Sequence, residues 1–242
     1  MGKKLLFEDL MIRIAGFSKF HLESKYKSED IRKTIHLHMF DALRTYMAGI
    51  SLMLIINDNK IEHIETNDED MKIAKLFLDD QLKDYNLESY FNNISIDYFM
   101  RVWNTFESCI KTLTGTISNE NPKNSIFKHL KLLNEKYQID KKESKSILEI
   151  IEFCTSFRNT LHAKFLYRGE KYDYQFRGVD FKFRDKYPLY IKCPLVGRSV
   201  LFAELSYELS GLFLMYGSFA DTEVIIPDPL YGFSDKMGDV FD

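Results

Sequence analysis

Long runs of apolar residues at helical spacing are the feature that most constrains the fold of this chain. Between residues 29 and 57, apolar side chains recur on one side of a helix: Ile31, Ile35, Met39, Leu43, Tyr46, Ile50, Met53 and Leu54. Ser28, followed by Glu29 and Asp30, is the expected N-terminal cap. The same spacing predicts helices over residues 70–85, 95–115, 125–137, 141–165 and about 198–217. Only 11 Gly and 5 Pro in 242 residues leave few tight turns, which favours a mainly helical protein.

One segment changes to a two-residue period. Tyr172, Tyr174 and Phe176 alternate with polar residues, and so do Val179, Phe181 and Phe183. Gly178 separates the two runs, which is typical of a β-hairpin over about 171–184. We therefore expect an all-α protein, a helical bundle with a β-hairpin inserted before the last helix. We divide it into an N-terminal helical extension packed on the core (1–90), a main helical domain (91–220) and a tail (221–242).

Composition and cysteine usage indicate a soluble intracellular protein. Apolar residues make up 45% of the chain and charged residues 29%, with a net charge of −3. The three cysteines, Cys109, Cys154 and Cys193, are odd in number and lack a CxxC spacing, so a disulfide framework is not expected. Charged residues interrupt the N-terminal apolar stretch, and the longest apolar run is too short to span a bilayer. We expect a cytoplasmic protein without a membrane partner.

The charge is unevenly distributed along the chain. Residues 164–198 contain nine Lys/Arg, four Asp/Glu and nine Phe/Tyr. Cations attract phosphates and aromatic rings stack on bases, so this composition suits nucleic acid. A hairpin that packs on a helical core needs the same residues for packing and solubility, and both interpretations stay open. The candidates for phosphate contact are Arg168, Lys171, Arg177, Lys182 and Arg184.

The predicted helix over 141–165 carries an unusual polar group. Arg158 points into the middle of its apolar arc, His162 follows one turn later at the edge, and Asn159 lies on the flank. A guanidinium does not lose its proton, and burying one without a partner costs several kcal/mol. Either a carboxylate meets Arg158, or this face opens onto a cleft or a subunit boundary. Glu107, at the edge of the apolar face of its own predicted helix, is the expected carboxylate.

The segment FRNTLHAKFLYRGEKYDYQFRGVDFKF, followed by an amphipathic helix, resembles HEPN-like proteins of prokaryotic defence and toxin systems. Their motif is an Arg, four to six residues and a His, often with Asn directly after the Arg. FESCIK upstream is similar to the Glu-bearing helix of one branch, so the resemblance covers roughly 95–217. This chain departs from the motif, because only three residues separate Arg158 from His162. At that spacing both side chains still lie on one face of a helix.

The resemblance implies a HEPN-type bundle and a metal-independent endoribonuclease without a cofactor. His162 would act as the general base for attack of the RNA 2′-OH, Arg158 would hold phosphate oxygens, and Asn159 would position them. It also implies a homodimer and a possible antitoxin or defence partner protein. A non-catalytic HEPN-like module that binds RNA or protein, and a purely structural dimer subunit, are the alternatives.

Two other patterns carry less weight. Arg32 and His38 have a five-residue spacing, but they lie about 120° apart on their helix and lack the adjacent Asn and the hairpin. His36 and His38 lie on opposite sides of the same helix, so they cannot chelate one ion. We expect no metal site.

Overall fold

The computed structural model describes residues 12, 15–20, 22–57, 83–163, 166–187, 190–191, 195–221 and 223–228. Five long or medium helices and a small sheet follow in the order α2 (Ile31–Asn57), α4 (Lys83–Ser118), α5 (Ile126–Lys136), α6 (Lys141–His162), β1 (Tyr172–Phe176), β2 (Val179–Phe183), β3 (Tyr190–Ile191) and α7 (Leu195–Phe219). The prediction of a mainly helical protein with an antiparallel hairpin before the last helix is confirmed. Residues 70–82 of the helix expected over 70–85 lie outside the described residues.

Helix α4 is longer than the predicted helix over 95–115, because it begins at Lys83 and continues through Gly115 to Ser118. The hydroxyl of Thr116 donates to the carbonyl of Thr112 at 2.9 Å inside the helix. The chain leaves the helix at Asn119, whose φ of 50° is left-handed. Its N–H donates to the carbonyl of Gly115 at 3.0 Å, which closes the last turn. Asn119 therefore ends α4.

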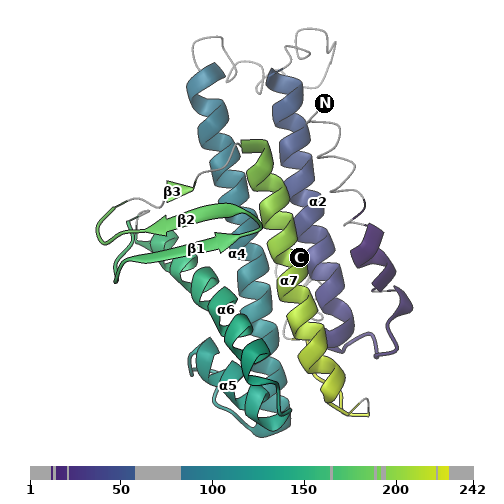
Figure 1. Ribbon diagram of the computed structural model, residues 1–242. Coiled ribbons are helices and arrows are strands. Elements are labelled where there is room, and N and C mark those ends of the chain that lie inside the picture. The colour runs from purple at the N-terminus through teal and green to yellow at the C-terminus, as the bar shows by residue number, and fades with distance from the viewer. Residues whose placement is uncertain are drawn as a thin grey trace, which may run out of the picture.

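Helices α2, α4 and α7 lie side by side and enclose one core (Figure 1). The Tyr46 ring of α2 stacks on Tyr98 of α4 with centroids 4.6 Å apart. The hydroxyl of Tyr98 donates to Oγ of Ser206 in α7 at 2.8 Å, so these two buried hydroxyl groups have a hydrogen-bond partner. The suggested domain boundary at residue 90 falls inside α4. No helix in the described part of the chain is long and apolar enough to cross a membrane.

Helix α6 joins the sheet to the helical core through its aromatic residues. The ring of Phe153 lies 4.6 Å from both Tyr174 of β1 and Phe181 of β2. One turn later, Phe157 meets Phe99 of α4 edge-on at 4.6 Å. The aromatic residues of the hairpin thus pack on α6 and fix the position of that helix. Figure 1 shows the strands β1 and β2 beside the end of α6.

The sheet is antiparallel, in the order β1-β2-β3. Arg177 and Gly178 connect β1 to β2, and both have left-handed φ values, 49° and 77°. Two such residues form the turn that matches the twist of paired strands. Glycine adopts this conformation without steric cost, which explains the Gly between the two alternating runs. The sequence did not predict the short strand β3.

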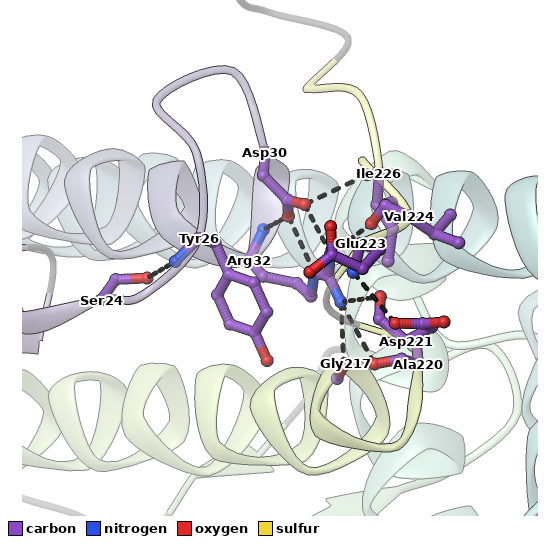
Figure 2. Close-up of polar contacts among 10 residues, drawn as sticks. All are labelled: Ser24, Tyr26, Asp30, Arg32, Gly217, Ala220, Asp221, Glu223, Val224 and Ile226. Carbon is purple, nitrogen blue, oxygen red and sulfur yellow. Dashed lines mark hydrogen bonds and ion pairs between the residues drawn. The ribbon is translucent and has the colours of Figure 1, made fainter.

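A buried ion pair fixes the start of α2 (Figure 2). Asp30 and Arg32 are 2% and 1% exposed, and their side chains meet at 2.9 Å and 2.6 Å through Nε and Nη2. Asp30 Oδ1 also accepts the backbone N–H of Arg32 at 2.8 Å. Asp30, not Ser28, therefore caps the helix. Ser28 instead donates to Glu29, since only Asp30 stands directly before the first helical residue.

The guanidinium of Arg32 also binds the carboxyl end of α7. Its Nη1 donates to the carbonyls of Ala220 at 3.4 Å and Asp221 at 3.2 Å (Figure 2). Carbonyls at a helix end have no intrahelical partners, so a cation there satisfies them. Gly217 permits this approach, because a Cβ at that position would lie 3.0 Å from Cγ of Arg32.

The first residues of the predicted tail are held against α2. The N–H of Ile31 donates to the carbonyl of Ile226 at 2.8 Å, and the N–H of Asp228 donates to the carbonyl of Glu29 at 3.1 Å. The carboxylate of Asp228 lies 2.8 Å from Nε2 of His38. Residues 223–228 are thus anchored on both their backbone and side chains, and the remainder of the predicted tail lies outside the described residues.

A buried histidine links α4 to α5. The Thr114 hydroxyl donates to the carbonyls of Ile110 and Lys111, so it accepts a hydrogen bond from Nδ1 of His129. Nε2 of His129 is buried and has no hydrogen-bond partner in the described part of the chain. Burial lowers the pKa of His129, an effect that Glu120 opposes. The neutral imidazole is therefore the form that the fold accommodates.

Replacing Arg32 should destabilise the protein strongly. Arg32→Ala leaves the Asp30 carboxylate buried without its cation, which costs about 3–5 kcal/mol. Arg101→Ala is the matched control, because Arg101 pairs with Asp97 at 2.8 Å on an exposed helix surface, where a pair contributes about 0–1 kcal/mol. Urea denaturation at pH 7 measures both. Equal losses in the two variants would contradict a central role for Arg32.

The neutral state of His129 predicts a pH dependence. Since its pKa is lower in the folded than in the unfolded state, the unfolded chain binds the proton first as pH falls below about 6.5. The free energy of unfolding should therefore fall below that pH, by at most about 1.4 kcal/mol per pH unit. His129→Gln, which does not titrate, should show a shallower slope in denaturation series between about pH 7.5 and 5.5. Parallel curves would refute this assignment.

Candidate functional site

The last two turns of α6 carry the polar group that the sequence singled out. Asn159 and His162 are exposed, while Arg158 is half-buried. The helix ends at His162, where the N–H of Ala163 donates to the carbonyl of Asn159 at 3.0 Å. Arg158 and His162 are four residues apart on a regular helix, which places their Cβ atoms about 5–6 Å apart. The three side chains thus share one end of the helix, and two of them face solvent.

Arg158 lacks the carboxylate that we expected. Glu107 pairs instead with Lys111, one turn along α4, at 2.7 Å. Glu107 and Lys111 are neighbours on the surface of α4, so their ion pair forms without any contact with α6. No ion pair between Glu107 and Arg158 forms in this structure.

The contacts of Arg158 leave hydrogen-bonding capacity unused. Its Nη1 lies 3.5 Å from Oδ1 of Asn159, which is a long contact. Its Nε is buried and has no hydrogen-bond partner among the described residues. Oγ1 of Thr155, three residues earlier on the same side of α6, has none there either. Sequence reasoning missed Thr155, because a single threonine in a helix carries no signal until its surroundings are known.

Arg158, Asn159 and His162 together have the chemistry to bind an anion and to transfer a proton beside it. The guanidinium has donors free to bind two oxygens at once, and an exposed imidazole can accept or donate a proton. The amide of Asn159 adds a donor and an acceptor beside the guanidinium. A phosphodiester placed against this end of α6 would meet a cation, a titratable group and a neutral positioning group.

Arg32 and His38, the other Arg–His pair with the spacing of the motif, both make contacts that stabilise the fold. Arg32 is buried against Asp30, and His38 pairs with the carboxylate of Asp228. Both side chains already satisfy partners that hold the chain together. They are therefore a poor match for a phosphate-binding site.

The five basic residues predicted to contact phosphate fall into two groups. Arg177 forms ion pairs with Glu208 and, at 3.7 Å, with Glu204, which ties the hairpin turn to α7. Arg184 binds Asp173 across the hairpin at 3.0 Å, and this hydrogen bond lowers the pKa of Asp173. Both charges are largely compensated within the fold. Arg168, Lys171 and Lys182 are exposed and form no ion pair with another described residue.

The buried thiols do not contribute chemistry. Cys109 and Cys154 are free and buried. Burial raises the pKa of both thiols, so the nucleophilic thiolate is disfavoured. No group of three His, Cys, Asp or Glu side chains among the described residues could hold a metal ion.

Comparison with known proteins adds no relative. No protein-family model matches the chain, and searches of curated proteins and of solved structures find no match.

Removing Arg158 should cost little stability. Without a carboxylate partner among the described residues, Arg158→Ala leaves no identified opposite charge behind, so the loss is limited to packing of the side-chain stem. We expect a decrease of about 1 kcal/mol or less in the free energy of unfolding. Urea denaturation should measure Arg158→Ala and Arg32→Ala side by side, so that the loss in the second variant serves as the reference. A loss as large as that of Arg32→Ala would show that Arg158 belongs to a buried ion pair.

Proposed function

We propose that this protein is a metal-independent endoribonuclease of a prokaryotic defence or toxin system. The observation that carries the proposal is Arg158, a half-buried guanidinium with no carboxylate partner among the described residues, beside exposed Asn159 and His162. An unpaired cation near the protein surface is a binding site for an anion. The order of Arg-Asn, His, hairpin and final helix, which resembles HEPN-like proteins, supports RNA as that anion.

The chemistry needs only these side chains and the RNA. His162 takes the proton from the 2′-OH, whose oxygen attacks the adjacent phosphorus and displaces the 5′-oxygen of the next nucleotide. The products are a 2′,3′-cyclic phosphate and a 5′-OH, with the proton returned to the leaving oxygen. Arg158 binds the non-bridging oxygens as negative charge develops, and Asn159 orients them.

The exposed cations near this end of α6 support the choice of a polyanionic substrate. Arg168 and Lys171 follow the helix in sequence and are exposed without a recorded ion pair among the described residues. Arg177, in contrast, is compensated by two glutamates. RNA would therefore run past Arg168 and Lys171 rather than along the whole hairpin.

We further propose a homodimer in which the ends of two α6 helices approach each other, as the resemblance to HEPN-like proteins implies. An antitoxin or another defence protein would be the partner that controls it. A non-catalytic module that binds RNA is the second candidate, and the short spacing between Arg158 and His162 favours it.

Cleavage assays with matched variants test the proposal. Purified protein incubated with transfer or messenger RNA in EDTA should produce fragments ending in a cyclic phosphate. Arg158→Ala and His162→Ala should each lower the rate about 100-fold or more, and Asn159→Ala should lower it less. Lys142→Ala, an exposed substitution at the opposite end of α6, should cleave normally.

Thermal melts of the same samples separate catalysis from folding. The proposal requires folded Arg158 and His162 variants without activity. Binding without cleavage by the unsubstituted protein would favour the non-catalytic module, and neither binding nor cleavage would refute both candidates.

A further inference from the structure

The structure separates the aromatic residues of the 164–198 segment by exposure. Side chains of seven of its Phe and Tyr residues are described, and six of them are buried or half-buried. Phe153 of α6 packs on three of the hairpin phenylalanines and on Tyr174, which accounts for their burial. Tyr187 is the exception, with 67% of its surface exposed. Composition left open whether these aromatic residues pack on the core or stack on bases, and among these seven only Tyr187 presents a largely free ring.

Backbone hydrogen bonds connect Tyr187 to the end of α6. The N–H of Leu166 donates to the carbonyl of Ala163 at 3.2 Å, directly after His162. Tyr167 then pairs with the Tyr187 segment, since its N–H donates to the carbonyl of Tyr187 at 3.1 Å and its carbonyl accepts from Lys186 at 2.8 Å. These links keep the Cα atoms of His162 and Tyr187 within about 20 Å. That span is a few nucleotides of single-stranded RNA.

The turn before Tyr187 holds the residue outward. Lys186 has a left-handed φ of 62°, and the N–H of Tyr187 donates to the carbonyl of Arg184 at 3.0 Å. The cations Arg168, Lys171 and Lys186 lie on the segments that these bonds join, and all three are exposed. Asp185, 3.9 Å from Lys186, offsets one of them, and Glu170 is also nearby in sequence. Glu152 of α6 acts electrostatically on Tyr167 together with Glu170 and Asp185, so these cations serve as individual phosphate contacts and not as a net positive patch.

We propose that Tyr187 is a stacking platform for an unpaired base of the RNA whose phosphate lies at Arg158 and His162. This inference rests on the proposed function and specifies its substrate as single-stranded RNA. A tyrosine ring stacks on any base, so the platform favours unpaired over paired RNA without reading sequence. Arg168 and Lys171 hold the backbone between the stacked base and the cleavage site.

Binding of two labelled oligomers tests this platform. One is an oligoadenylate with 2′-O-methyl sugars, which cannot undergo 2′-OH attack, and the other has the same backbone with abasic residues. Fluorescence anisotropy should show that the protein binds the first about tenfold more tightly. Tyr187→Ala should abolish this preference, while Tyr187→Phe keeps it because the ring remains. Phe219→Ala, at the far end of α7 and 47% exposed, is the matched control and should keep it.

The outcomes distinguish the platform from the nuclease. Arg158→Ala should weaken binding of both oligomers alike, because it removes a phosphate contact. Equal affinity of the unsubstituted protein for both oligomers, or an unchanged preference in Tyr187→Ala, would overturn the platform and leave the cleavage site untouched. A preference that depends on Tyr187 without any RNA cleavage would support the platform and refute the nuclease. No binding of either oligomer would overturn the platform.

Discussion

The ion pair between Asp30 and Arg32 joins three parts of the chain that are far apart in sequence. It caps the first turn of α2, binds the carbonyls after α7 and accepts the N–H of Ile226 on Asp30. The Tyr26 ring covers the guanidinium at 4.0 Å. Two charges removed from water are stabilising only when every donor and acceptor is satisfied. The pair therefore specifies how α2, α7 and residues 223–228 fit together.

Helix α6 connects this core to the candidate site. Its middle turns use Phe153 and Phe157 to fix the hairpin and α4 around it. Its last turns still bury Phe157 and Thr160 on one side, while Asn159 and His162 are exposed beside half-buried Arg158. A site at the end of a helix whose preceding turns are tightly packed is held in position, while its own side chains stay accessible. Among the described residues, Nε of Arg158 has no hydrogen-bond partner, in contrast to the bidentate pairing of Arg32.

The two arginines show why the same residue type serves different roles. Both are on helices, and each has a histidine nearby in sequence. Arg32 stands two residues from Asp30, and local geometry gives it a bidentate partner that excludes water. Among the described residues, Arg158 has only a long contact with Asn159. Full burial with a carboxylate produces a structural arginine, whereas partial exposure without one among the described residues leaves a cation available to a ligand.

The sequence by itself determined the helices, the hairpin and the position of the polar group on α6, because apolar periodicity and turn residues are local. It also singled out Arg158, Asn159 and His162 by their place on the helical wheel. Only the tertiary structure decided which charges were already paired between elements, such as Arg177 with Glu208 and Arg184 with Asp173. It likewise decided that Tyr187, rather than the other described aromatic residues of 164–198, is exposed. Pairing and burial depend on which elements meet in space, and spacing along one chain does not contain that information.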